Sequence, residues 1–388
     1  MNFDDVALFA AWGIFALWAV LLVPSACIML PRTLARMTDR LPDPASWPLV
    51  SMIIPARDEG EKIDAALRSV LAVDYPNLEI IAVDDRSRDE TGRVMDRLAA
   101  EDPRLRVIHI ETLPDGWLGK NHAMHVAAQA ARGEFLLFTD GDVMFAPDAL
   151  RRAVAYAEHT RIDHLCLSPN LVPGGYFENA LVSYFILLFT AGLQPWLVPS
   201  RLRFVYAGMG AFNMLRHSAY RAIGGHVPIR LDVLDDVKLG KLVKRHGLRQ
   251  DLLGAQDRVR VRWQDSAWGV IRGLEKNGFA SCDYSLPLLV FVSALTLAVT
   301  LGPYLGACLL TGAPALGCIA TILLLHVMYA ALAHQAGCSA WVFPALPLAC
   351  LGMLFAFWRS AIITLRQGGV RWRDTFYPLD LLRANVYR

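Results

Sequence analysis

The sequence predicts an α/β protein in which a mostly parallel sheet is accompanied by membrane-spanning helices near both ends of the chain. Three observations lead to this fold class. Short apolar runs alternate with segments of helical periodicity from residue 49 to residue 139, as in a parallel sheet with crossover helices. The 388 residues are 55% hydrophobic with a mean hydropathy of +0.35, more than a soluble domain needs. Long uncharged segments occur at both ends of the chain.

Charge and cysteine content exclude several classes of protein. The chain has 38 Lys and Arg against 36 Asp and Glu, so its charge gives no reason to expect a nucleic-acid partner. The seven cysteines contain no C-x-x-C spacing, which argues against a zinc site or a disulfide framework.

The N-terminal segment, residues 1–31, predicts one transmembrane helix. No charged residue occurs from Val6 to Leu30, and about 20 apolar residues are enough to span a bilayer. The stretch is too long for the apolar core of a signal peptide and is preceded by Asp4 and Asp5. Arginines in the proline-rich linker at 32–48 place that linker in the cytoplasm by the positive-inside rule. We therefore expect a multi-pass membrane protein whose soluble domain faces the cytoplasm.

The cytoplasmic domain is expected at 49–284, and its first half alternates strands with helices. Because parallel strands end at one edge of a sheet, ligands are expected to bind at their carboxyl ends. The predicted strands are 49–55, 78–84, 105–110 and 135–139, and the predicted helices are 61–72, 90–100 and 121–131.

The apolar segment at 179–199 is interrupted by Pro195 and Pro199. We expect a helix that lies on the membrane surface or lines a lipid channel. A true span and an ordinary core helix are the alternatives. A span would place the parts of the soluble domain before and after this segment on opposite sides of the membrane, although both are expected to line one ligand site.

Transmembrane helices are predicted at 285–366, from apolar segments at 286–311, 313–333 and 341–365. Three crossings would put the tail, 367–388, outside, whereas its arginines favour the cytoplasm. One segment would then be re-entrant or interfacial, with Gly302-Pro303 as a possible break, or the tail violates the rule. We expect a cytoplasmic tail that lies at the membrane interface.

Acidic residues follow the second and fourth predicted strands. Asp140 and Asp142 flank one glycine, and two such carboxylates suit Mg²⁺ or Mn²⁺ held mainly by substrate phosphate oxygens, although acidic turns are also common. Asp84 and Asp85 can accept hydrogen bonds from a base or a ribose. Lys120 is placed to meet phosphate. Asp235 and Asp236 are candidates for a general base.

Five motifs in order resemble the family 2 glycosyltransferases of the GT-A (Rossmann-like) fold over about residues 50 to 262. They are Pro55-Ala56-Arg57-Asp58-Glu59, the run from Val83 to Thr91, Asp140-Gly141-Asp142, Gly224-Gly225 and Asp235-Asp236. The runs at 116–123 and 370–380 are similar to the membrane-bound branch associated with hopanoid and carotenoid biosynthesis.

This resemblance implies inverting transfer from a nucleotide sugar, usually a UDP-sugar, to a hydroxyl or carboxyl of a membrane lipid. It implies that Pro55, Arg57 and Glu59 line the donor site and that Asp84 or Asp85 contacts the uracil. Asp140 and Asp142 would hold the ribose and the metal, and Asp236 would be the base, with Asp235 as the other candidate.

Two departures from the family pattern matter. Lys238 stands where many relatives carry an acidic residue, and it either lowers the pKa of the base or points to solvent. The Gln-x-x-Arg-Trp signature of processive synthases is missing, which favours transfer of a single sugar. A polyprenyl-phosphate sugar synthase and an inactive sugar-lipid binding subunit remain the alternatives. The sequence specifies neither the sugar, nor the lipid, nor the oligomeric state.

Overall fold

The computed structural model describes residues 3–387, which form two compact units. The sheet unit comprises Pro31–Leu171, Pro195–Arg262 and the segment from Asn385 onward. The helical unit comprises the chain up to Leu30, Val172–Gln194 and Trp263–Ala384. Each unit is therefore assembled from three separate stretches of sequence.

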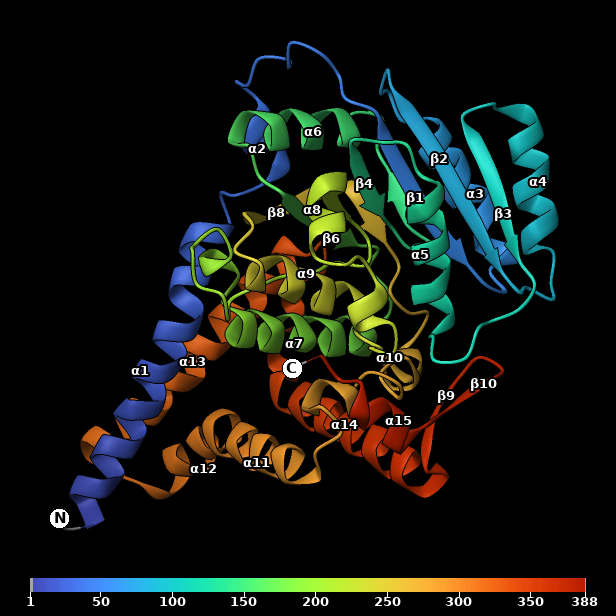
Figure 1. The fold of residues 1–388 in the computed structure, drawn as a ribbon. Helices are drawn as coiled ribbons and strands as arrows, with labels where there is room; N and C mark the ends of the chain where they lie inside the picture. Colours follow the sequence, from blue (N-terminus) through green and yellow to red (C-terminus); the bar gives the residue numbers. More distant parts are fainter. Residues whose placement is uncertain (1–2, 388) are drawn as a thin grey trace. The chain divides into compact units, whose positions relative to one another are not determined.

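The sheet unit is built on an eight-stranded sheet with the order β3-β2-β1-β4-β7-β6-β8-β5 (Figure 1). The strands β1, β2, β3 and β4 run parallel, and so do β6 and β8. Antiparallel pairs join β4 to β7, β7 to β6, and β8 to β5. The bounds are β1 Val50–Ala56, β2 Leu78–Asp85, β3 Leu105–Ile110, β4 Phe135–Phe138, β5 Met144–Phe145, β6 His164–Leu171, β7 Asn213–Arg216 and β8 Gln250–Val261.

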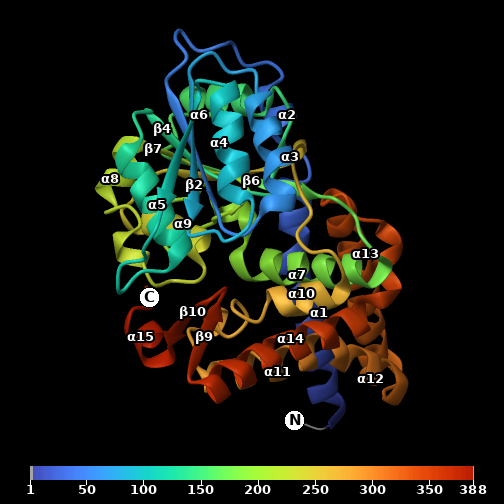
Figure 2. The ribbon, with the colours of Figure 1, turned by 90° about the vertical axis from the view of Figure 1, so that its right-hand side faces the viewer.

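Helices cover both faces of this sheet (Figure 2). Successive side chains of a strand point to opposite faces, so Ile54 packs in the core formed with α3, α4 and α6, while Ile53 packs in the core formed with α5, α8 and α9. The bounds are α2 Leu34–Thr38, α3 Gly60–Leu71, α4 Thr91–Glu101, α5 Gly119–Ala130, α6 Ala149–Thr160, α8 His217–Ala222 and α9 Asp235–Arg245.

The predicted α/β fold with a mostly parallel sheet is confirmed. All four predicted strands and all three predicted helices lie within two residues of the observed bounds. The sequence did not predict β5, β6 or β7. The four residues of β7 follow a glycine-rich loop and lead directly into α8, so they carry too short a pattern to be recognised as a strand.

Within residues 3–387, the helical unit contains five helical stretches that are long and apolar enough to cross a membrane. They are Asp4–Met29, Tyr176–Leu193, Leu286–Leu309, Gly312–Gln335 and Ala340–Gln367. The bounds are α1 Phe3–Met29, α7 Tyr176–Leu193, α10 Ala267–Gly273, α11 Leu286–Thr296, α12 Gly302–Leu309, α13 Gly312–Gln335, α14 Leu346–Gln367, β9 Gly369–Trp372, β10 Thr375–Pro378 and α15 Leu379–Ala384.

Two details of these apolar helices differ from expectation. The helix expected at 179–199 ends at Leu193, because Gln194 adopts a left-handed conformation and Pro195 begins a separate 3₁₀ turn. Gly302-Pro303 does not break its helix, because a π-helical turn at Leu297–Leu301 leads into α12. Pro303 has no N–H that could donate to the carbonyl of Val299, four residues earlier. That carbonyl instead accepts the indole N–H of Trp18 at 2.8 Å.

Candidate functional site

The site lies at the carboxyl ends of the central strands, where Asp140 follows β4 and Gly210 lies in the loop before β7. The backbone of Gly210 joins the two carboxylates predicted to act at this edge. Its N–H donates to Oδ2 of Asp236 at 2.7 Å, and its carbonyl accepts the N–H of Asp140 at 3.1 Å. Asp140 and the first turn of α9 are thereby held in one arrangement by the same glycine.

The glycines of this loop allow it to pack directly on α9. A Cβ atom at Gly208 would lie 1.8 Å from the backbone oxygen of Asp236, and one at Gly210 would lie 2.6 Å from Oδ2 of Asp140. At Gly208 the close approach of two backbones requires glycine, whereas a Cβ at Gly210 would displace the carboxylate of Asp140. The loop therefore fixes the position of Asp236 without a side chain of its own.

Lys120, in the first turn of α5, connects the acidic groups. Its Nζ lies 2.7 Å from Oδ1 of Asp140 and 3.2 Å from Oδ2 of Asp235. Burial opposes the charge of Lys120, but the carboxylates of Asp140, Asp235 and Asp236 outweigh it and raise the lysine pKa. Lys120 is thus a fixed positive charge among three carboxylates.

The start of α5 is attached to the segment that precedes α9. The N–H of Leu118 donates to the carbonyl of Arg230 at 2.8 Å. The buried side-chain amide of Asn121 donates to the carbonyls of Ile229 and Asp232 at 2.8 and 3.0 Å. These bonds keep Lys120 in register with the acidic pair of α9.

Asp236 has the properties of a general base. Its Oδ1 accepts the N–H of Val237 at 2.8 Å, in addition to the bond from Gly210. Burial and the neighbouring carboxylate of Asp235 raise the pKa of Asp236 to about 6, while Lys120 opposes this shift. A carboxylate with a pKa close to neutrality is a better proton acceptor than an ordinary aspartate.

These groups open onto one pocket, which brings together four of the ten site residues predicted from the sequence. The other six do not line it; they are Pro55, Arg57, Glu59, Asp84, Asp85 and Asp142. Lys120, Asp140, Asp235 and Asp236 all line it, as do Met124, Phe138, Thr139, Gly210, Asn213, His226 and Leu239. The structure thus brings together a lysine and two acidic motifs that lie about a hundred residues apart in the sequence.

Asp142 lies beside this group and fits a metal-binding role. Burial and the negative charges of Asp140 and Glu59 raise the pKa of Asp142 to about 6, so a cation there would relieve unfavourable charge. Among residues 3–387, no group of three or more His, Cys, Asp or Glu side chains could hold a metal ion. A pair of carboxylates is nevertheless sufficient for Mg²⁺, which usually takes its remaining ligands from substrate phosphates and water.

The acidic pair at the end of β2 makes two different sets of contacts. Asp85 is buried and binds the guanidinium of Arg86 through both oxygens, at 2.7 and 2.9 Å. Oδ1 of Asp84 accepts the N–H of Ser87 at 3.1 Å, and its Oδ2 lies 3.1 Å from Nδ1 of His109.

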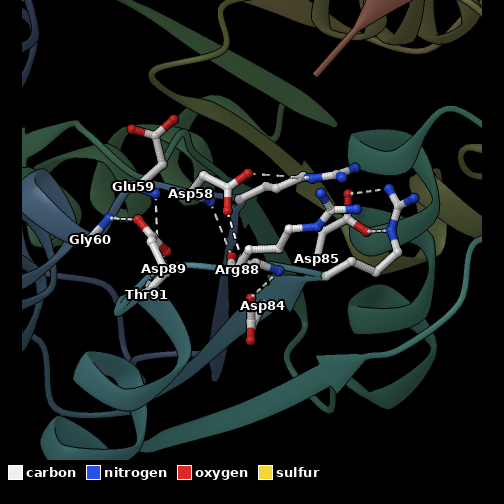
Figure 3. Close-up of polar contacts among 11 residues, drawn as sticks. Asp58, Glu59, Gly60, Asp84, Asp85, Arg88, Asp89 and Thr91 are labelled. Atoms are coloured by element: carbon white, nitrogen blue, oxygen red, sulfur yellow. Dashed lines mark hydrogen bonds and ion pairs between the residues drawn. The ribbon is translucent and has the colours of Figure 1, made fainter. Parts of the chain in front are cut away.

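The loops after β1 and β2 are joined by hydrogen bonds (Figure 3). Asp58 Oδ1 accepts the N–H of Arg88 at 2.8 Å, and the N–H of Glu59 donates to Thr91 Oγ1 at 2.8 Å. Asp89 accepts the N–H of Gly60 at 2.9 Å. This loop pair holds the predicted donor-site residues, with Pro55 in β1 and Arg57 directly before the left-handed Asp58.

The interpretation that Lys238 points to solvent is wrong, because its side chain is buried. The charge that opposes the raised pKa of Asp236 is that of Lys120. The ammonium of Lys238 donates to the carbonyl of Tyr387 at 2.8 Å and lies 3.9 Å from Asp232. The N–H of Tyr387 in turn donates to Asp232 at 3.1 Å.

Sequence reasoning missed three contributors to this site: Gly210, His226 and Tyr387. Gly210 lies in a glycine-punctuated run, and His226 directly follows the Gly224-Gly225 motif, so their sequence neighbours could have indicated both residues. Tyr387 is about 150 positions from the helix that it contacts, and its sequence gave no indication of that contact.

Comparisons with known proteins identify the family and the fold that this chain resembles. The model of the family described as "Glycosyl transferase family 2" matches residues 51–224. The chain is similar to 4,4'-diaponeurosporenoate glycosyltransferase of Staphylococcus aureus strain USA300, with 23% identity over 340 residues, which cover 85% of this chain and 88% of that protein. The protein of the same name from Staphylococcus haemolyticus strain JCSC1435 is 24% identical over 198 residues, or 50% of this chain and 52% of that one.

A solved structure supports the fold. A mannosyltransferase from Pyrobaculum calidifontis, in complex with GDP-Man and Mn²⁺, superposes with a TM-score of 0.50 at 21% identity, covering 91% of this chain and 98% of that one. The resemblance inferred from the sequence motifs is confirmed. The chain is therefore a glycosyltransferase, with a family 2 domain at residues 51–224 on a GT-A fold.

Proposed function

We propose that this glycosyltransferase moves one sugar from a nucleotide sugar, most simply a UDP-sugar, to the hydroxyl of a membrane lipid such as a hopanoid or a carotenoid, with inversion at the anomeric carbon. The observation that carries the proposal is the environment of Asp236. A buried carboxylate with a pKa of about 6, in a pocket with Lys120 and Asp140, suits a base that activates a hydroxyl.

In the proposed reaction, Asp236 accepts the proton of the acceptor hydroxyl as its oxygen attacks the anomeric carbon. The bond from that carbon to the diphosphate oxygen breaks, and the nucleoside diphosphate leaves with the electron pair. The N–H groups of Gly210 and Val237 each donate to one oxygen of Asp236, so the carboxylate is held in a fixed orientation. Lys120 supplies positive charge beside the reacting groups.

The donor is proposed to bind along the edge formed by the β1, β2 and β4 ends. Pro55, Arg57, Glu59, Asp84 and Asp85 would surround the nucleotide. Asp140 and Asp142 would hold Mg²⁺ or Mn²⁺. When bound, such an ion stabilises the charge on a departing diphosphate. The raised pKa of Asp142 supports a cation at this position.

A lipid acceptor is supported by the apolar helices of the helical unit and by the S. aureus relative, whose name gives 4,4'-diaponeurosporenoate as its substrate. A single transfer is supported by the missing Gln-x-x-Arg-Trp motif. We place the reaction on the cytoplasmic side of the bacterial inner membrane, as the arginine-rich linker after the first apolar helix favours.

The test is transfer by the detergent-purified full-length protein, supplied with UDP- and GDP-sugars, Mn²⁺ and extracted bacterial lipids, with products identified by mass spectrometry. Asp236→Asn should reduce kcat by at least about a hundredfold, because general-base catalysis contributes about 10² to 10⁴. Unimpaired turnover of this variant would instead identify an acceptor that is already ionised, such as a carboxylate or a polyprenyl phosphate.

The same preparation separates an enzyme from an inactive binding subunit. Metal-stimulated hydrolysis of one nucleotide sugar without added lipid supports the proposal. If every nucleotide sugar is bound and none is turned over with or without lipids, the chain is a binding subunit.

A further inference from the structure

His226 is a fully buried side chain in the pocket that also contains Lys120 and the acidic residues. It lies at the end of the Gly224-Gly225 turn, in which both glycines have positive φ, +79° and +59°. A Cβ atom at Gly225 would lie 2.8 Å from the ring of Tyr220. The double glycine therefore allows the chain to fold back closely on Tyr220 and places His226 beside it.

The contacts of the Tyr220 hydroxyl favour one of the two neutral tautomers of His226. This oxygen lies 2.7 Å from Nδ1 of His226 and accepts the backbone N–H of the same residue at 3.3 Å. With the oxygen already accepting, the single hydroxyl proton is best directed at Nδ1, which then acts as the acceptor. The proton of the neutral imidazole is consequently on Nε2.

Nε2 of His226 is buried and has no hydrogen-bond partner within residues 3–387. Leaving a buried donor unpaired is unfavourable, so such atoms are uncommon unless a water molecule or a ligand completes them. Burial and the charges of His125 and Lys120 lower the pKa of His226 to about 3, so the ring stays neutral at physiological pH. The group offered to a ligand is a neutral N–H donor.

The other polar groups of the pocket define what that ligand must be. Asp140, Asp235 and Asp236 can accept hydrogen bonds, whereas His226 donates one. A hydroxyl satisfies both, because it donates to a carboxylate and accepts from an N–H. A phosphate group suits the pocket less well, because its three carboxylates outnumber the single ammonium of Lys120 and leave it with net negative charge.

We propose that His226 determines donor specificity by donating a hydrogen bond from Nε2 to one hydroxyl of the transferred sugar. This inference rests on the proposed nucleotide-sugar donor. Tyr220 is a positioning residue in this scheme, because it acts only through the tautomer of His226. Sugars without a correctly placed hydroxyl leave Nε2 unpaired and are rejected.

The experiment compares the accepted nucleotide sugar with analogues that each lack one sugar hydroxyl, using the full-length protein in detergent. One analogue should lose about tenfold to a hundredfold in kcat/KM, the cost of an unpaired buried donor. In His226→Met, which fills the space without a donor, kcat/KM for the normal donor should fall by a similar factor and the penalty for that analogue should disappear. His226→Gln, which can place an N–H near Nε2, should restore part of the discrimination.

Two further measurements test the assignment. The affinity for the free nucleoside diphosphate, measured by calorimetry, should be unchanged in His226→Met and in the control His246→Met at the exposed end of α9. Tyr220→Phe should weaken the discrimination between the normal donor and the deoxy analogue without abolishing transfer.

The inference is overturned if no deoxy analogue loses its penalty in His226→Met, or if the affinity for the nucleoside diphosphate falls together with turnover. The absence of turnover with every nucleotide sugar by the unmodified protein would instead refute the proposed function, so the two failures are distinguishable.

Discussion

Asp236 combines burial with backbone hydrogen bonds from Gly210 and Val237. These bonds favour the carboxylate, whereas burial and Asp235 favour the protonated acid, and the balance raises the pKa of Asp236 to about 6. The hydrogen bonds fix where the carboxylate points, and the raised pKa makes it a useful base near neutral pH.

The pH dependence of transfer should report this pKa. Protonated Asp236 cannot accept a proton, so kcat/KM should fall as pH drops below about 6, by about tenfold per pH unit well below it. The acid side of the pH profile is measured from initial rates between about pH 5 and about pH 8. The donor is kept subsaturating, and protein stability is checked at each pH. An apparent pKa near 4, the usual aspartate value, would contradict the assignment.

The metal-binding role proposed for Asp142 can be tested through protein stability. Its raised pKa means that the folded state binds more protons than the unfolded state between about pH 4 and 6, so the free energy of unfolding decreases as pH rises through that range. Above it, Asp142→Asn should raise the Tm of the metal-free protein by a few degrees, because it removes buried negative charge.

The same variant should lose most of the increase in Tm that Mn²⁺ gives to the unmodified protein. Asp115→Asn, at an exposed position, is the matched control and should behave like the unmodified protein. An undiminished Mn²⁺ effect in Asp142→Asn, measured by differential scanning fluorimetry, would place the ion elsewhere.

At the scale of elements, the glycine loop and α9 act as a single part. Gly208→Ala would put a methyl group against the carbonyl of Asp236, so the first turn of α9 must move. We expect kcat to fall by about a hundredfold, since small displacements of catalytic groups have effects of this size. Gly254→Ala, whose added Cβ would have its nearest neighbour at 3.7 Å, is the control in the same unit. Equal kcat values would show that the loop tolerates the shift.

The segment from Asn385 to Tyr387 is a second element that supports α9. Besides the bond from Lys238, the ring of Tyr387 has Arg245 and Lys241 at 5.1 and 5.9 Å from its centroid, within the range of cation–π contacts. Both contacts come from one face of the helix that carries Asp235 and Asp236.

Removal of residues 385–388 should therefore lower both Tm and kcat, because it takes the carbonyl acceptor from the buried ammonium of Lys238. Adding Lys238→Met to the truncated chain should restore much of the Tm, since a buried apolar side chain needs no partner. The four proteins to compare are the unmodified chain, the truncated chain, Lys238→Met and the truncated chain with Lys238→Met. Their Tm values, measured by thermal unfolding, give the coupling between the tail and Lys238. Independent, additive effects of the two changes would mean that the tail and Lys238 do not interact.

Some of these elements were predictable and others were not. The strands that end near Asp84 and Asp140 were predictable from local apolar runs. The acidic turns at their ends were predictable from residue type alone. The strand β7 and the contact of Lys238 with Tyr387 depend on distant partners, which local patterns do not encode. The tautomer of His226 depends on Tyr220, six residues away but across a double-glycine turn.

At the scale of the whole molecule, the sheet constrains membrane topology. Strands before and after α7 belong to one sheet, so the residues on either side of α7 are on the same face of any membrane. The segment at 385–387 belongs to the same unit as that sheet. An even number of crossings must therefore occur between Trp263 and Ala384, although three helical stretches there are long enough to cross.

We expect one of those three stretches to enter the membrane without crossing it. A fluorescent protein joined to the C-terminus should report the same side as one inserted in the linker at residues 41–48, and an alkaline phosphatase fusion at the C-terminus should be inactive. Activity of that phosphatase fusion in intact cells would require an odd number of crossings.

The sheet unit's construction from three chain segments has a practical consequence for anyone who wants the catalytic half without detergent. Simple truncation of the chain does not yield this unit. A fragment that ends at Arg262 still contains the apolar segment Val172–Gln194. It also lacks Tyr387, whose carbonyl accepts from Lys238. A water-soluble version needs a rewired chain, in which a linker joins Leu171 to Pro195 and a second linker carries Asn385–Arg388 after Arg262.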